Sequence, residues 1–277
     1  MSPLLTVENL RISFPSRQGP VEVVRGVSFS LGRERLGIVG ESGSGKSQTG
    51  RAILGLTPAT GTATADKLEF DGIDLRQADA MQWRALRGAR MSMVMQDPKF
   101  SLNPVMTIGK QIMEAVKLHG GRSEARDKSV AMLEAVQIRD PERVMAAYPH
   151  ELSGGMGQRA MIAMMLVTEP DLLIADEPTS ALDVTVQIEV LRILDRLVSE
   201  RGMGLIFISH DLQLVSTFCD RVLVMYAGQV VEELDASKLG EARHPYTQGL
   251  LNCLPKIAGD QRPLPVLARD AAWLNEG

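Results

Sequence analysis

The stretch Arg35-Leu36-Gly37-Ile38-Val39-Gly40-Glu41-Ser42-Gly43-Ser44-Gly45-Lys46-Ser47 joins an apolar run to a glycine-rich loop. Its last eight residues fit the pattern GxxxxGK[ST], in which backbone N–H groups cradle the phosphates of a nucleoside triphosphate. The apolar run predicts a buried strand, and the residues from Ser47 to Leu56 predict the helix that leaves the loop. A loop between a strand and a helix N-terminus directs N–H groups at an anion. We therefore expect a triphosphate ligand; the alternative, a glycine-rich turn with an exposed lysine, fits this context poorly.

The residue types of this phosphate loop (residues 40–47) suit separate tasks in triphosphate binding. Glycines at 40, 43 and 45 allow the main chain to wrap closely around an anion. Lys46 supplies positive charge to the β- and γ-phosphates, and the Ser47 hydroxyl can bind magnesium. The nucleotide-binding residues expected here are Gly40, Glu41, Ser42, Gly43, Ser44, Gly45, Lys46, Ser47 and Gln48.

A second apolar run, Leu172-Leu173-Ile174-Ala175, ends in the adjacent carboxylates of Asp176 and Glu177. Magnesium-assisted phosphate hydrolysis needs two such groups, one to hold the hydrated metal and one to polarise the attacking water. We assign the first task to Asp176 and the second to Glu177. Taken alone, the two acids could simply cap the following turn. The phosphate loop on the same chain favours the catalytic interpretation.

Composition excludes several classes of protein. The 277 residues are 44% hydrophobic and give a length-based prior of about two domains. A formal net charge of −4 and only 4% aromatic residues disfavour a nucleic-acid partner. The longest apolar run, Ala160 to Val167, is far below the roughly 18 residues of a membrane span, and no secretion signal follows Met1. Two cysteines, Cys219 and Cys253, fit a reducing cytosol.

Hydrophobic periodicity predicts a mixed α/β fold. Alternating residues up to about 33 indicate antiparallel strands, whereas short apolar runs indicate buried parallel strands that share a sheet with residues 36–39. These parallel strands are expected at 91–95, 172–175 and 205–208. Further strands are expected at 221–225 and 229–233, and helices at 123–136 and 184–199. We predict a core of residues 1–100 and 169–240 with a helical insert at 101–168. Residues 241–277 are richer in proline and polar side chains and are expected to be an extension rather than core.

The segment Ser153-Gly154-Gly155-Met156-Gly157-Gln158-Arg159 opens another helix with a glycine-rich, anion-attracting N-terminus. One triphosphate does not need two glycine-rich helix N-termini. The simplest arrangement is a head-to-tail pair of subunits, in which this signature segment (residues 153–159) faces the γ-phosphate held by the partner. With these three motifs the chain resembles the ATP-binding cassette family, the motor subunits of ABC transporters.

The resemblance covers residues 1 to about 235 and implies a P-loop NTPase (RecA-like) core, an N-terminal antiparallel β subdomain and an inserted α-helical subdomain. It implies that Phe14 stacks on adenine, although an aromatic residue in an early strand is usually core. It implies that Gln96 contacts the metal and the attacking water and that His210 touches the γ-phosphate. Asp183, in Ser180-Ala181-Leu182-Asp183, would reach across the dimer. The partner's ATP would be bound by Ser153, Gly154, Gly155 and Gln158.

The resemblance narrows to the oligopeptide/dipeptide/nickel importer group. The residues that carry it are Gln96-Asp97-Pro98, Ser101-Leu102-Asn103-Pro104, Tyr148-Pro149-His150-Glu151-Leu152 and His244-Pro245-Tyr246-Thr247. Met156 stands where most of the superfamily has glutamine, which resembles the D-type member of the group. This implies a non-identical F-type ATPase partner, two transmembrane permeases and an extracytoplasmic substrate-binding protein. It also implies a peripheral position on the cytoplasmic face of the inner membrane.

The resemblance implies an ATP-hydrolysing motor, with ATP and Mg²⁺ as cofactors, for a bacterial importer of di- or oligopeptides. Residues 101–109 would receive a short helix from a permease. Some members of the group hold an iron–sulfur centre in a cysteine-rich tail; because Cys253 stands alone there, no iron–sulfur cluster is expected.

Two functions other than transport, and cargoes other than peptides, are the alternatives. A soluble ABC ATPase of DNA repair, chromosome structure or translation would typically add coiled coils, zinc modules, basic patches or a second cassette, and the sequence shows none of these. A GTP switch would need an Asn/Thr-Lys-x-Asp motif, which is not found either. The cargo could also be nickel or another small solute, because this subunit does not contact it. Whether both ATP sites of the dimer are active is likewise open.

Overall fold

The computed structural model describes residues 2–119, 121–180, 182–253 and 273 in two compact units. The first unit contains the chain up to Gln77 and again from Ile206 onwards, and the second contains Ala78–Leu205. The chain therefore leaves the first unit and returns to it. The domain boundaries expected from the sequence, with a helical insert limited to 101–168, remain a proposal.

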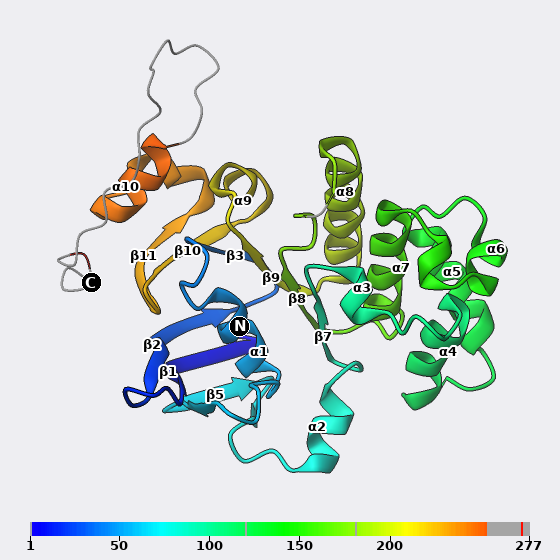
Figure 1. The fold of residues 1–277 in the computed structure, drawn as a ribbon, viewed down its shortest axis with the longest axis horizontal. Coiled ribbons are helices and arrows are strands. Elements are labelled where there is room, and N and C mark those ends of the chain that lie inside the picture. Colours follow the sequence, from blue (N-terminus) through cyan, green and yellow to red (C-terminus); the bar gives the residue numbers. More distant parts are fainter. Residues whose placement is uncertain (1, 120, 181, 254–272, 274–277) are drawn as a thin grey trace, which may run out of the picture. The chain divides into compact units, whose positions relative to one another are not determined.

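The first unit holds an antiparallel sheet, as the N-terminal alternation predicted (Figure 1). Its strands run in the order β2-β1-β5-β6, with β4 also paired to β1. Leu5 pairs with Leu31 of β2 on one side and with Phe70 of β5 on the other, and all three side chains are fully buried or nearly so. The strands are β1 Leu5–Phe14, β2 Val21–Leu31, β4 Thr62–Thr64, β5 Lys67–Phe70 and β6 Ile73–Asp74.

A second set of strands in the first unit positions the phosphate loop. Strand β10 (Arg221–Tyr226) lies parallel to β3 (Arg35–Val39) and antiparallel to β11 (Gln229–Asp235). Strand β3 is buried on both faces, as a parallel strand covered by helices should be. It leads through the loop into α1 (Lys46–Ile53), while β9 (Gly204–Ser209) leads to α9 (Leu212–Phe218). Residues 236–241 and α10 (Pro245–Asn252) follow β11 in the described part of this unit.

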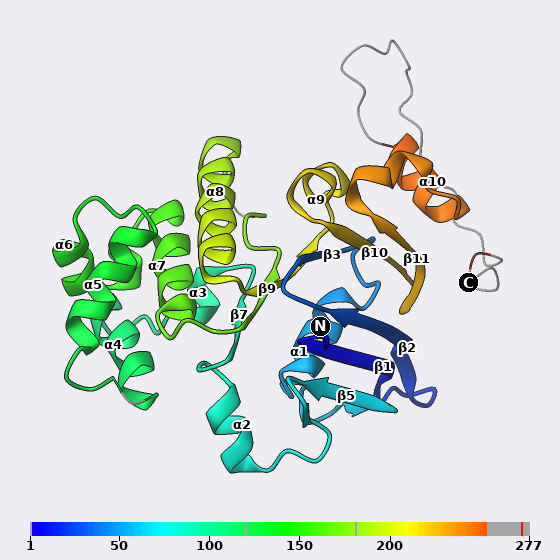
Figure 2. The ribbon, with the colours of Figure 1, turned by 180° about the vertical axis from the view of Figure 1, so that it is seen from behind.

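The second unit combines two parallel strands with a group of helices. Met91 of β7 (Met91–Val94) pairs with Leu172 of β8 (Leu172–Asp176), and every residue of both strands is buried. Figures 1 and 2 both show α4 to α7 grouped together, and contacts join α4 to α5, α6 and α7. The helices are α2 Ala80–Leu86, α3 Pro98–Ser101, α4 Ile108–Leu118, α5 Ala125–Ala135, α6 Pro141–Ala146, α7 Gly154–Leu166 and α8 Val184–Arg201. No helix in the described ranges is long and apolar enough to cross a membrane.

One expectation about the C-terminal segment is wrong. Residues from about 240 were expected to lie outside the core, yet Tyr246 and Thr247 have no exposed surface. The ring of Tyr246 is buried against Tyr226, with centroids 4.5 Å apart. Proline and polar residues near 245 reflect the start of α10, which has proline in its first turn and His244 as its N-cap, rather than an unpacked tail. The rest of the expected extension, residues 254–272 and 274–277, lies outside the described residues.

Candidate functional site

The phosphate loop has a backbone that only glycine fits at its first position. Gly40 follows β3 with φ +152°, and a Cβ added there would lie 2.1 Å from the carbonyl oxygen of Met225. The neighbouring strand β10 thus approaches too closely for any side chain. The loop thus starts directly after β3 and ends in the first turn of α1.

The loop also has the polar groups that a polyphosphate and its counter-ion need. Lys46 is 5% exposed, and its Nζ donates to the carbonyl oxygens of Gly40 at 2.8 Å and Glu41 at 2.9 Å. The hydroxyl of Ser44 and Oε1 of Gln48 are buried and have no hydrogen-bond partner among the described residues. A buried ammonium beside polar atoms that lack partners fits an anionic ligand with an associated cation.

His210 shares a cavity with this loop. The cavity, of about 350 Å³, is lined by Val39, Gly40, Glu41, Ser42, His210, Leu212 and Leu250. His210 is exposed and directly follows β9, and the next residue, Asp211, caps α9 by accepting from the N–H of Leu214 at 2.9 Å. The end of β9 and the capped start of α9 therefore fix the backbone of His210 beside the loop.

In the second unit the structure brings Gln96 and Glu177 together. Nε2 of Gln96 donates to Oε2 of Glu177 at 3.2 Å. Asp176, the last residue of β8, is only 5% exposed, and Glu177 follows with φ +47°. A non-glycine residue in this left-handed region is strained, and such strain clusters at functional sites. The carboxylate of Glu177 is thus displayed at the end of a buried strand beside a neutral amide, an arrangement suited to orienting a water molecule.

The signature segment begins α7. Oγ of Ser153 accepts from the N–H of Met156 at 3.4 Å, and a Cβ added at Gly155 would lie 2.7 Å from Cγ1 of Val186. Beside it lies a cavity of about 340 Å³ whose lining includes Ser153, Gly155, Arg139, Arg143 and Arg159. The neighbouring Asp183 is exposed and caps α8, with Oδ1 accepting from Thr185 and Val186 at 3.1 Å each. The segment therefore presents small residues and arginines around an open space.

Gln158 and Phe14, both expected to contact a nucleotide, are not displayed openly at a binding surface. Gln158 is 1% exposed and its Nε2 donates to the carbonyl oxygen of Pro178, so its side chain faces the interior and ties α7 to the turn after Glu177. This placement does not suit contact with a nucleotide. Phe14 is half-buried at the end of β1, and a Cβ added at Gly61 would lie 2.5 Å from its ring. Stacking of Phe14 on adenine stays a prediction.

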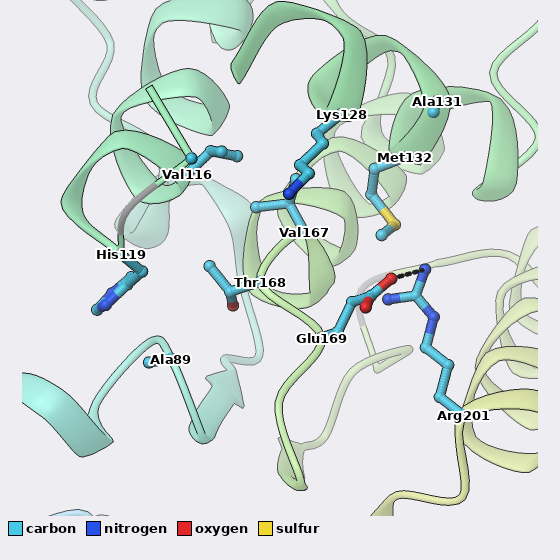
Figure 3. Close-up of a pocket in the computed structure, with 11 residues that line it drawn as sticks. Ala89, Val116, His119, Lys128, Ala131, Met132, Val167, Thr168, Glu169 and Arg201 are labelled. Carbon is cyan, nitrogen blue, oxygen red and sulfur yellow. Dashed lines mark ion pairs between the residues drawn. The ribbon is translucent and has the colours of Figure 1, made fainter. Parts of the chain in front are cut away.

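A further cavity, of about 330 Å³, lies in the second unit and contains none of the expected site residues (Figure 3). Its charged groups are already paired. Glu169 lies 3.6 Å from Arg201, whose guanidinium also donates to the carbonyl oxygen of Leu166 at 3.0 Å, and Lys128 lies 3.0 Å from Glu124. The cavity lacks the glycine-rich N–H groups of the phosphate loop, and we do not include it in the candidate site.

The sequence interpretation missed Tyr246. The N–H of Glu41, in the phosphate loop, donates to Oη of Tyr246 at 3.0 Å. The only signal was the segment His244-Pro245-Tyr246-Thr247, which pointed to a family group without giving the tyrosine a task.

Comparison with known proteins decides the family. The model of the ABC transporter family matches residues 24–180, more than half of the chain. The chain belongs to the ABC transporter family. Within it, the chain is 48% identical over 268 residues to the dipeptide transport ATP-binding protein DppD of Escherichia coli (strain K12), covering 95% of this chain and 82% of the relative. It is 46% identical over 271 residues to the probable D,D-dipeptide transport ATP-binding protein DdpD of the same strain, covering 96% and 82%.

Solved structures agree with this membership. The dimeric bacterial ABC transporter cassette MJ0796 superposes with a TM-score of 0.75 at 25% identity, covering 84% of this chain and 98% of the other. The cbiO1 subunit from Clostridium perfringens, part of the transporter complex cbiONQ, gives 0.72 at 26% identity, covering 87% and 92%. The expected α/β cassette fold is thereby confirmed for this ABC ATPase.

Proposed function

We propose that this chain is the ATP-hydrolysing subunit of an importer of di- or oligopeptides. The observation that carries the ATPase part is the pair Gln96–Glu177, a carboxylate oriented by an amide, on the same chain as a phosphate loop with a buried lysine. The peptide cargo is supported by relatives such as DppD, whose names state dipeptide transport. Nickel or another small solute is the alternative cargo.

In this proposal the phosphate loop binds ATP. N–H groups of the loop and of the first turn of α1 meet the phosphates, and Lys46 moves its charge from the carbonyls of Gly40 and Glu41 to the β- and γ-phosphates. Ser47, Gln96 and Asp176 would hold Mg²⁺, which supplies neutralisation of the charge that develops on the phosphates. Their hydroxyl, amide and carboxylate oxygens are ligands that this cation accepts.

Glu177 acts as the base in the hydrolysis step. Its carboxylate accepts a proton from the attacking water, while the amide of Gln96 orients that carboxylate by donating to Oε2. His210 donates a hydrogen bond to the γ-phosphate. In this step Glu177 takes a proton, Gln96 orients the carboxylate of Glu177, and His210 binds the γ-phosphate.

The signature segment is proposed to serve a partner's ATP rather than this chain's own. Ser153, Gly154 and Gly155 would meet the γ-phosphate held by a second, non-identical ATPase of the F type, and Asp183 would reach across that dimer. The open cavity beside α7 supports this assignment through Arg139 and Arg143, which can attract a strongly anionic triphosphate, although Asp140 also lines it and Arg159 is paired with Glu189.

We place the permease contact on residues 101–109. Gln111, which is buried, holds this loop by accepting from the N–H of Asn103 at 2.8 Å and donating to the carbonyl of Met106 at 3.0 Å. The loop thereby presents Val105 with 79% of its surface exposed. A firmly held loop with an exposed apolar residue suits a short amphipathic helix of a permease, and this contact would keep the subunit at the cytoplasmic face of the inner membrane.

The test is to tag the chain in its native host, solubilise membranes gently and identify the proteins that co-purify. Two permeases, an F-type ATPase and a substrate-binding protein are expected, and peptides or nickel released from that binding protein identify the cargo. ATP hydrolysis by the purified complex completes the test. Recovery with ribosomes or nucleic acid and without any permease would contradict transport while leaving the ATPase assignment standing.

A further inference from the structure

We propose that Tyr246 is a positioning residue for the phosphate loop. Its hydroxyl fixes the peptide group between Gly40 and Glu41 and so prepares the loop for ATP. The inference rests on the proposed ATP binding, and it gives the C-terminal segment a task in that reaction.

The peptide group between Gly40 and Glu41 is held at both ends. Its N–H, on Glu41, donates to Oη of Tyr246 at 3.0 Å, and its carbonyl oxygen, on Gly40, accepts from Nζ of Lys46 at 2.8 Å. Hydrogen bonds at the two ends of one amide polarise each other and strengthen both. The hydroxyl of Tyr246 therefore strengthens the hydrogen bond between the Gly40 carbonyl and Lys46 as well as fixing the loop backbone.

The tyrosine is itself held rigidly. Tyr246 has no exposed surface, its ring lies 4.5 Å from that of Tyr226, and its N–H donates to Nδ1 of His244 at 3.2 Å. One turn later on α10, Leu250 lines the cavity that contains the phosphate loop and His210. A phenol on a packed, capped helix offers its hydroxyl at a fixed point.

The loop needs such an external restraint. Gly40 has φ +152° and no side chain, so the orientation of the next peptide group is not limited by a Cβ. A loop that is already ordered loses less conformational freedom when its ligand binds, which raises affinity. Loss of the hydroxyl should therefore weaken ATP binding even when the fold survives.

The experiment compares Tyr246→Phe with Thr247→Val in the full-length chain. Each variant removes one hydroxyl from adjacent, fully buried residues of α10, but Oγ1 of Thr247 has no hydrogen-bond partner among the described residues. ATP affinity is measured by isothermal titration calorimetry and stability by thermal unfolding without nucleotide. We expect Tyr246→Phe to weaken ATP binding about 3- to 10-fold, the effect of one net hydrogen bond, and Thr247→Val to bind as the wild type does.

Hydrogen exchange supplies a second measurement, which begins with the wild-type chain. In the wild-type chain the Glu41 amide should exchange slowly although its residue is half-exposed, and Tyr246→Phe should speed exchange in residues 40–46 without changing β9.

Four results would contradict the proposed role of Tyr246. Wild-type affinity in Tyr246→Phe with a lower unfolding temperature would mean that the tyrosine only stabilises the fold, and fast exchange of Glu41 in the wild type would likewise overturn the proposal. Equal losses of affinity in Tyr246→Phe and Thr247→Val would assign the effect to packing of α10. Failure of the wild-type chain to bind ATP would overturn the proposed function and this inference with it.

Discussion

The side-chain amide of Gln96 donates a hydrogen bond to Oε2 of Glu177 over 3.2 Å. The two residues follow β7 and β8, whose parallel pairing ends with Val94 opposite Ala175. Register therefore brings a neutral amide from one strand to a carboxylate from the next. The amide orients the carboxylate without neutralising it, so Glu177 can still accept a proton.

Glu177→Gln should leave ATP binding intact and abolish hydrolysis at this chain's own site, because an amide cannot take a proton from water. The checks are calorimetric ATP affinity of the variant chain and phosphate release by the assembled complex. A general base typically contributes about 100- to 10,000-fold to the rate. Unchanged hydrolysis in the complex would show that the partner's site alone sustains turnover.

Lys46→Met should weaken ATP binding by at least about 10-fold, because a charge-assisted bond to phosphate contributes roughly 1.5–3 kcal/mol. Lys238→Met is the matched control, since Lys238 is an exposed lysine that pairs with Asp235 at 2.9 Å on the surface. Its ATP affinity should equal that of the wild type. Equal affinity in both variants would remove Lys46 from the binding site.

Val105→Glu should reduce co-purification of the permeases without changing ATP affinity, because a charge replaces the apolar residue that the loop presents. Met81→Glu is the control: Met81 is 76% exposed in α2 of the same unit, outside residues 101–109. Co-purified permease is quantified by mass spectrometry against the tagged chain. Full recovery with Val105→Glu would place the docking surface elsewhere.

Gly37→Ala should destabilise the fold by about 1–3 kcal/mol, the usual cost of overpacking a core. A Cβ there would lie 2.2 Å from Cγ1 of Val215 in α9 and 3.2 Å from Sγ of Cys219. Gly32→Ala should stay within about 0.5 kcal/mol of the wild type, because no atom lies within 4 Å of its Cβ.

Denaturant unfolding measures both glycine variants. Adding Val215→Ala to Gly37→Ala should recover part of the loss, and strictly additive effects would contradict the clash.

Cys219 should resist alkylation in the folded chain. Burial, followed by the nearby charge of Asp220, raises the pKa of the thiol to about 12 despite the opposing charge of Arg35. At pH 8 only about one thiol in ten thousand is then ionised, and the thiolate is the reactive form. Maleimide labelling with peptide mass spectrometry should modify Cys219 only after denaturation; rapid native labelling would refute its burial.

Much of the fold could be predicted because its strands are short apolar runs. The runs at 35–39, 172–175 and 205–208 correspond to β3, β8 and β9 within one residue at each end. Helix α8 was expected at 184–199 and ends two residues later, where Gly202 takes φ +57° as its C-cap. In these elements local pattern and tertiary burial agree.

Other features depend on contacts between residues far apart in the chain. Tyr246 lies 205 residues from Glu41, and no local pattern reveals that its hydroxyl meets the phosphate loop. Helix α2 has a capping box formed by Asp79 and Gln82, but only Leu86 is buried, so its hydrophobic period is weak. Gln158 was expected at a nucleotide because of its motif, whereas its side chain is buried and donates to the carbonyl oxygen of Pro178, 20 residues away in the chain.

The division of the first unit between both ends of the chain has a consequence for its synthesis. The N–H of Arg35, at the start of β3, donates to Asp220, 185 residues later, at the point where β10 begins. A ribosome adding 5–20 residues per second makes these partners about 10–40 s apart. Throughout that interval β3 has an unpaired edge, a state in which nascent chains aggregate or recruit chaperones. The nucleotide-binding loop thus matures late in translation, after the second unit has already emerged.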